Sequence, residues 1–149
     1  MKHASVAAAL MGAILAASSA SAEEARTAKM YKPLQCGCCD EYTKYLEENG
    51  FKVEVESLQN DKLMLLKRMT SVPEPLYGCH TLMLDGYVVE GLVPIDTVEK
   101  LLEERPKIRG ISLPGMPVGA PGMPGRKAAP LTIYQLPRGA AAPTVFARE

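Results

Sequence analysis

The chain contains 149 residues, with 17 Lys or Arg against 17 Asp or Glu. This balanced charge, without a cluster of basic residues, argues against a nucleic-acid partner. The length suits one domain with a single modest core, because domains typically contain about 100 to 150 residues.

Residues 1–22 predict a secretory signal peptide. Lys2 precedes an apolar, Ala-rich run from Val6 to Ala17, and the triplet Ala20-Ser21-Ala22 carries the small residues at which signal peptidase cleaves. The apolar run is too short to cross a bilayer, which needs about 20 residues. We therefore expect an exported single domain, residues 23–149, with a net charge of 16 − 17 = −1 and no membrane span after cleavage.

After the expected signal peptide, the hydrophobic pattern predicts the order β-α-β-α-β-β-α. Strands are indicated where apolar and polar residues alternate, and helices where apolar residues recur at helical spacing. In the second helix, this spacing predicts that Leu63, Leu66 and Met69 face the core. The expected strands are residues 28–31, 51–56, 81–84 and 87–90, and the expected helices are residues 40–49, 61–69 and 95–104.

Local signals mark the ends of these elements. Gly50 can end the first helix as a C-cap, Asn60 can cap the second helix, and Pro94 suits the first turn of the third. Asp85-Gly86, between two apolar runs, is a strong signal for a two-residue hairpin.

The C-terminal part of the chain has a different composition. Residues 105–130 are rich in Pro and Gly, which predicts a loop. Residues 131–149 predict a terminal β-hairpin, with strands at 131–136 and 144–147. The whole pattern predicts the α/β class, and it resembles a thioredoxin-like α/β sandwich extended by this C-terminal part.

Four cysteines lie in the expected mature part, at Cys36, Cys38, Cys39 and Cys79. Export favours disulfides. However, the Cα atoms of adjacent residues are about 3.8 Å apart, less than the roughly 4.4 to 6.8 Å that a disulfide spans. The workable cross-links join Cys36 to Cys39, or Cys79 to one of the other three. In a thioredoxin-like fold, the loop before the third strand would bring Cys79 to the N-terminus of the first helix, so all four sulfurs would converge.

Such a group of thiolates is typical of a soft-metal site. Thiolates select copper(I), zinc or iron–sulfur clusters over hard cations. Zinc prefers four sulfurs in a tetrahedron around one ion, which neighbouring cysteines make difficult, whereas bridging thiolates can share several copper(I) ions. We therefore expect copper(I), with zinc as the second choice.

Two other interpretations remain open. Cys36 and Cys39 have the Cys-x-x-Cys spacing of a thiol-disulfide oxidoreductase, with Cys36 as nucleophile and Cys39 as resolving thiol. The helix N-terminus would favour the thiolate in either case. A disulfide-stapled binding module is the third interpretation.

Three further side chains are candidate metal ligands. His80 is the only histidine of the expected mature chain and follows Cys79 directly, although in an extended segment the two side chains would point to opposite faces. Met116 and Met123 lie in a repeated Pro-Gly-Met motif of the predicted loop, and thioether sulfur is a soft ligand.

Three motifs stand out in the chain: Cys36-Gly-Cys-Cys39 after a short strand, Tyr77-Gly-Cys79-His80-Thr81, and the segment with two Pro-Gly-Met repeats that ends at Met123. Together they resemble the CopG-like family of exported copper-resistance proteins. The resemblance covers residues 29–146. It implies a periplasmic thioredoxin-like domain with a multinuclear copper cluster, bridged by the cysteines at all four positions.

The same resemblance implies a role in copper resistance, through sequestration, transfer or redox conversion of copper. We therefore expect a metal-binding protein whose catalytic activity, if it has one, is copper redox chemistry. Its expected partners are copper ions and the copper-carrier or efflux proteins of the periplasm.

Overall fold

The computed structural model describes residues 26–149. The predicted signal peptide, residues 1–22, lies outside the described residues. Within the described range, none of the helices has the length and apolar character needed to cross a membrane.

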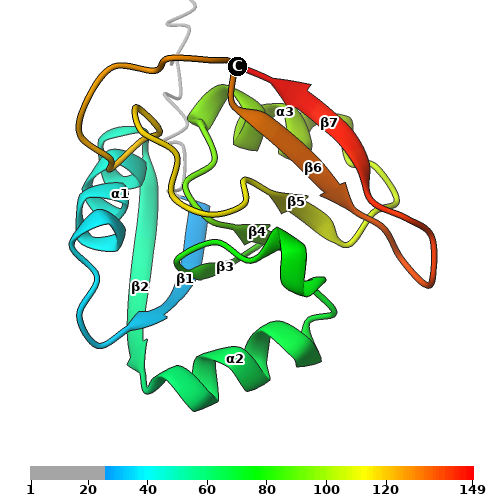
Figure 1. Ribbon diagram of the computed structural model, residues 1–149, viewed down its shortest axis with the longest axis horizontal. Helices are drawn as coiled ribbons and strands as arrows, with labels where there is room; N and C mark the ends of the chain where they lie inside the picture. Colours follow the sequence, from blue (N-terminus) through cyan, green and yellow to red (C-terminus); the bar gives the residue numbers. More distant parts are fainter. Residues whose placement is uncertain (1–25) are drawn as a thin grey trace, which may run out of the picture.

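A mixed β-sheet of seven strands forms the centre of the structure, in the order β2-β1-β3-β4-β5-β6-β7 (Figure 1). β1 is parallel to β2, β4 is parallel to β5, and the other neighbouring pairs are antiparallel. The strands are β1 (Arg26–Pro33), β2 (Phe51–Leu58), β3 (Thr81–Leu84), β4 (Tyr87–Glu90), β5 (Gly110–Ser112), β6 (Thr132–Leu136) and β7 (Thr144–Arg148). The predicted α/β class is confirmed, and so is the predicted order β-α-β-α-β-β-α, which one strand that was not predicted, β5, follows.

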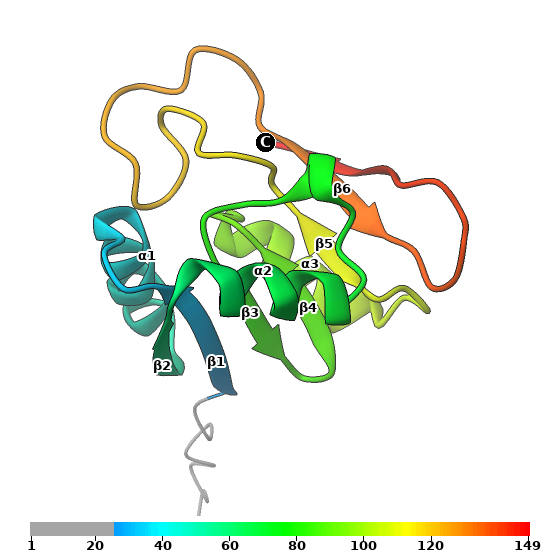
Figure 2. The same ribbon diagram turned by 60° about the horizontal axis from the view of Figure 1, so that its bottom comes forward.

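Three α-helices pack against this sheet. In Figure 2, α2 crosses in front of β3 and β4 while α3 lies behind them. The first helix begins at Gly37 rather than at residue 40. In the second helix, Gln59 rather than Asn60 occupies the N-cap position, without a side-chain hydrogen bond to the helix. The helices are α1 (Gly37–Glu48), α2 (Asn60–Met69) and α3 (Ile95–Glu104), and one turn of 3-10 helix, η1 (Glu74–Leu76), precedes β3.

The main core lies between the sheet and the helices α1 and α3. Tyr42 and Leu46 from α1 and Leu101 from α3 are fully buried there, against Val89 of β4. Val88, the neighbour of Val89, belongs to a smaller apolar cluster on the opposite face, because successive side chains of a strand alternate in direction. The end of β4 is therefore enclosed on both faces.

The helix α2 turns a different face inward from the one predicted. Leu63 is buried as expected, but Leu66 is partly exposed and Met69 is 71% exposed. Lys67 is fully buried in their place. The physical reason is that the inner face of α2 meets a polar partner, the buried carboxylate of Glu90 at the end of β4.

The strand β5 was not predicted, because it interrupts the Pro/Gly-rich region that indicated an uninterrupted loop. It pairs with β4 on one side and β6 on the other. Gly110 passes so close to Val88 that a Cβ atom would overlap the Val88 carbonyl, so this position requires glycine. The predicted terminal hairpin is present as β6 and β7, and β5 joins it to the main sheet.

Candidate metal centre

The first three cysteines are held at the N-terminus of α1. Cys36 occupies the N-cap position, where its carbonyl accepts hydrogen bonds from the amides of Cys39 (3.1 Å) and Asp40 (3.2 Å). Lys32, at the end of β1, forms an ion pair with Asp40 (3.0 Å) and so fixes the first helical turn to the sheet. Cys38 and Cys39 therefore lie in the first turn of α1.

Cys36 and Cys39 are joined by a disulfide, with their Cα atoms 5.3 Å apart. This is one of the cross-links that the spacing allowed. Cys38 and Cys79 are free thiols. The structure thus shows the four cysteines as one disulfide and two thiols.

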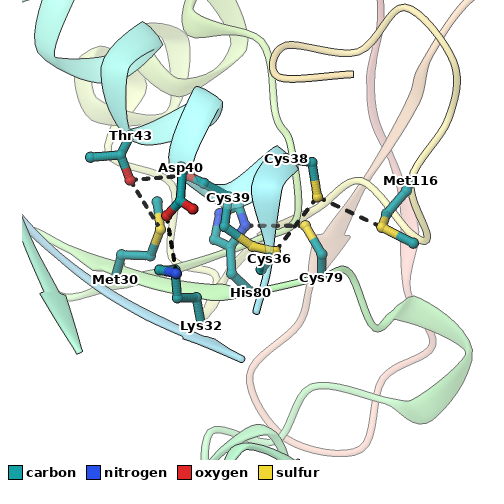
Figure 3. The surroundings of a disulfide bond; sticks show 10 residues. All are labelled: Met30, Lys32, Cys36, Cys38, Cys39, Asp40, Thr43, Cys79, His80 and Met116. Carbon is teal, nitrogen blue, oxygen red and sulfur yellow. Dashed lines mark hydrogen bonds and ion pairs between the residues drawn. A yellow bond between two sulfur atoms is a disulfide. The ribbon is translucent and has the colours of Figure 1, made fainter. Parts of the chain in front are cut away.

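Cys79 joins this group from the turn between η1 and β3, as the thioredoxin-like resemblance implied. The four sulfur atoms of Cys36, Cys38, Cys39 and Cys79 all lie within 4.8 Å of one another (Figure 3). The sulfurs of Cys36 and Cys38 are 3.6 Å apart. Cys39 is buried, whereas the other three are partly exposed, so the group is accessible from one side.

These donors fit a soft metal once the disulfide is reduced. A tetrahedral zinc ion with bonds of about 2.3 Å would hold its sulfurs about 3.8 Å apart, and bridging thiolates of a cluster require similar spacings. The 4.8 Å limit on the sulfur separations is compatible with both arrangements. Sulfur donors without a carboxylate exclude a site built for a hard cation.

The free thiol of Cys79 is protonated at neutral pH when no metal is bound. Burial, together with the neighbouring Cys38, raises the pKa of Cys79 to about 12. The positive charge of Lys67 acts in the opposite direction. A metal ion must therefore displace a proton from Cys79 in order to bind there.

His80 lies against the sulfur group. Its Nδ1 atom is 3.3 Å from the sulfur of Cys79, and its ring packs against Tyr42 with the centroids 5.0 Å apart. Burial, reinforced by the charge of Lys67, lowers the pKa of His80 to about 3, so the imidazole is neutral. Its buried Nε2 atom has no hydrogen-bond partner within residues 26–149.

The two loop methionines occupy different positions. Met116 places its sulfur 3.8 Å from the sulfur of Cys38 and is 54% exposed. Its neighbour Gly115 donates a backbone hydrogen bond to Tyr77 (2.9 Å), which anchors the loop beside Cys79. Met123 is partly buried and packs against the main core.

The loop also touches the helix that carries the first three cysteines. Gly122 has a φ of +86°, and a Cβ atom there would lie 2.6 Å from the carbonyl oxygen of Cys38. The segment between β5 and β6, yellow to orange in Figure 1, accordingly reaches over to α1. The sequence suggested the soft character of Met116 but gave no indication of this contact.

A buried ion pair behind the cysteines was missed by the sequence analysis. Lys67 and Glu90 pair with both side chains fully buried. The sequence signal covers only Glu90, because the hairpin at Asp85-Gly86 sets that residue opposite Thr81, two residues after Cys79.

Comparisons with known proteins point to the same region of the chain. A family model described as "Protein of unknown function, DUF411" matches residues 76–123, which include Cys79, His80 and both loop methionines. None of the curated proteins compared with the chain matches it.

Two solved structures resemble almost the whole described fold. The structure named "Copper resistance protein copG- Form 2" has 36% sequence identity and a TM-score of 0.75, and the match covers 85% of this chain and 99% of that one. "Copper resistance protein copG- Form 1" has 35% identity and the same TM-score, with 85% and 98% covered. The chain therefore belongs to the CopG-like family of copper-resistance proteins.

Proposed function

We propose that the protein binds copper(I) in the periplasm, through a multinuclear site bridged by Cys36, Cys38, Cys39 and Cys79. The observation that carries this proposal is the convergence of all four sulfur atoms within 4.8 Å of one another. The protein would contribute to copper resistance by sequestering copper, passing it on or changing its oxidation state. The predicted signal peptide supports the periplasmic location.

Two features favour copper(I) over zinc. The thioether of Met116 adds a fifth soft sulfur at 3.8 Å from Cys38, and thioethers suit copper(I) better than zinc. The similar solved structures are named copper-resistance proteins. His80 lies close enough to the centre to serve as a further ligand, because its Nδ1 atom is 3.3 Å from the sulfur of Cys79 and the neutral imidazole can donate a lone pair. Met123 stays a candidate ligand on the softness of its thioether alone.

The exposed side of the metal centre would allow copper to be transferred to or from a partner protein. Cys36, Cys38 and Cys79 are partly exposed, and Met116 beside them is 54% exposed. A copper carrier or efflux protein of the periplasm could reach copper at this side, because ligands at a surface can be exchanged one at a time.

The test is anaerobic loading of the reduced mature protein with copper(I), followed by measurement of bound copper by mass spectrometry. We expect more than one copper ion per chain, and weaker copper retention in Cys38→Ser and in Cys79→Ser, each of which keeps three of the four cysteines. Met69→Leu, which changes an exposed methionine on α2, is the control. Binding of less than one copper ion per chain, or unchanged retention in both serine variants, would contradict the proposal.

A second candidate function is favoured by the disulfide between Cys36 and Cys39. As a thiol-disulfide oxidoreductase, the reduced protein would attack a substrate disulfide with the Cys36 thiolate, forming a mixed disulfide and releasing one substrate thiolate. The Cys39 thiolate would then displace the second, leaving the substrate reduced and the protein oxidised.

The two functions differ in the cysteines that they need. Disulfide exchange requires only Cys36 and Cys39, so insulin reduction should survive the double change Cys38→Ser/Cys79→Ser. The proposed copper site requires all four cysteines, and the same double variant should lose it.

A further inference from the structure

The ion pair between Lys67 and Glu90 is unusual because neither side chain has any exposed surface. Taking two charges out of water is costly, and a buried pair often stabilises a protein no better than apolar side chains would. Such a pair is therefore poorly explained by stability alone. Its neighbours suggest another reason for its presence.

The carboxylate of Glu90 holds both ends of the segment that contains Cys79. Its Oε1 atom accepts a hydrogen bond from the backbone amide of Gly78 (2.8 Å), and its Oε2 atom accepts one from the hydroxyl of Thr81 (2.7 Å). Cys79 and His80 lie between these two anchor points. One side chain thus fixes the segment on both sides of the thiol.

The residue after Glu90 completes this clamp. The amide of Gly91 donates a hydrogen bond to the carbonyl of His80 (3.1 Å). Gly78 packs directly on Gly91, and a Cβ atom on Gly78 would come within 2.7 Å of the Gly91 nitrogen. The backbone around Cys79 is therefore held against the end of β4 by contacts that leave it little room to move.

Lys67 contributes both contacts and charge. Its ammonium group pairs with Glu90, donates to the hydroxyl of Thr81 (3.1 Å) and lies 5.5 Å from the centre of the Tyr77 ring. Tyr77 and Thr81 each lie two residues from Cys79, so this ammonium group is beside the segment that carries the thiol. Glu90 balances the charge of this group, so the buried pair adds no net charge, and Lys67 acts on nearby thiolates as the positive end of a buried dipole.

We propose that Lys67 and Glu90 are positioning residues for the metal centre, with Glu90 fixing the Gly78–Thr81 segment and Lys67 placing a buried positive charge behind the thiolates. This inference rests on the proposed copper-binding function. It assigns the two residues separate roles, which different variants can distinguish.

Three double variants separate the roles. Lys67→Met/Glu90→Gln removes both charges but keeps an acceptor oxygen for the amide of Gly78. Lys67→Met/Glu90→Leu removes the charges and both clamp hydrogen bonds while retaining side-chain volume. Lys29→Met/Glu56→Gln removes the exposed ion pair between β1 and β2 and is the matched control.

Two measurements are made on each variant. Hydrogen exchange of the Gly78–His80 amides in the reduced, metal-free protein should be faster only in Lys67→Met/Glu90→Leu. Competition with bathocuproine disulfonate should show weaker copper(I) retention in both Lys67 variants. The expected loss is about 10- to 100-fold, as is usual when groups that orient metal ligands are removed. The control should match wild type in both measurements.

A double-mutant cycle tests whether these effects act through Cys79. In a Cys79→Ser background, loss of the ion pair should cause little further decrease in copper retention, because the ligand that it positions is gone. A merely structural role would weaken retention equally in both backgrounds. That result, or wild-type amide exchange and retention in Lys67→Met/Glu90→Leu, would overturn the inference.

The outcome can be separated from that of the proposed function. If the wild-type protein takes up no copper, the proposed function fails, and with it the role assigned to the charge of Lys67. The amide exchange still decides whether Glu90 clamps the Cys79 segment. If Lys67→Met/Glu90→Leu does not fold, Lys67→Met/Glu90→Gln remains as the test of charge, and unchanged retention in it overturns the role of Lys67.

Discussion

The sulfur atoms of Cys38 and Met116 lie 3.8 Å apart although the two residues are separated by 78 positions in the chain. The contact joins the first turn of α1 to the loop between β5 and β6. It exists because Gly115 is hydrogen-bonded to Tyr77 on one side of Met116 and Gly122 packs on α1 on the other. Met116 is thus held beside the cysteines by backbone contacts on both sides.

Met116→Leu should weaken copper(I) retention while leaving the fold intact. Leucine has similar volume but no sulfur, so the change removes only the thioether. We expect about a tenfold loss, equivalent to about 1.4 kcal/mol, measured by competition with bicinchoninate. Met69→Leu, at an exposed position on α2, should have no effect. Equal retention in the two variants would exclude Met116 as a ligand.

The thiol content should control metal uptake. The oxidised protein has two free thiols, Cys38 and Cys79, because Cys36 and Cys39 are joined. Titration of the unfolded chain with a thiol reagent should therefore give two thiols before reduction and four after it. Copper(I) uptake should be full only in the reduced form. Full uptake by protein that still contains the disulfide would contradict the four-thiolate site.

Acid should destabilise the metal-free protein through His80. Its pKa is about 3 in the folded protein, against about 6.5 in the unfolded chain. Above pH 6.5 neither state binds the proton, so His80 contributes no pH dependence. As the pH falls below 6.5 the unfolded state takes up the proton and the folded state does not, so the free energy of unfolding decreases.

The expected loss from His80 is about 2 kcal/mol at pH 5 relative to pH 7.5. Urea denaturation of wild type and His80→Gln at both pH values checks it, since the titration of carboxylates affects both proteins alike. The wild type should lose about this much more than the variant. Parallel losses would show that His80 is protonated normally in the folded state.

Gly122→Ala should destabilise the protein and loosen the loop from α1. A methyl group there meets the carbonyl of Cys38 at 2.6 Å, and overpacking of this kind typically costs about 1–3 kcal/mol. Gly139→Ala is the matched control, because Gly139 has a similar φ of +80° but open space around its Cβ position. The difference between their free energies of unfolding isolates the contact, and copper retention should fall only in Gly122→Ala. Equal losses of unfolding free energy in Gly122→Ala and Gly139→Ala would mean that the loop shifts to accommodate the methyl group and that the close contact with α1 adds nothing to stability.

The elements with strong local signals were predictable from the sequence. Asp85-Gly86 fixed both strands of the hairpin, β3 and β4, because a two-residue turn sets their register. The strand β5 was not predictable in the same way. It has three residues and lies in a Pro/Gly-rich region, and its pairing depends on β4 and β6, which are distant in the chain.

In the candidate site, too, features set by nearby residues were predictable and features set by distant residues were not. The spacing of Cys36, Cys38 and Cys39 restricts their chemistry by itself, whereas the approach of Cys79 was implied only by the fold. The burial of Lys67 is an example of a feature that the local sequence pattern cannot predict. A lysine in an amphipathic helix normally faces water, and it is buried here only because Glu90 offers a partner from another element.

The loop that carries Met116 is fixed at both ends, because β5 and β6 are neighbouring antiparallel strands. Such tethering gives the thioether a high effective concentration at the cysteines. A thioether can therefore bind a metal ion there for much of the time even though its individual bond to the metal is weak. In the proposed copper site, Met116 would then leave the metal and return many times during the residence of one copper ion. Each departure would open a coordination position on the accessible side of the site. An incoming ligand could bind the copper ion at this position before any thiolate dissociates from it.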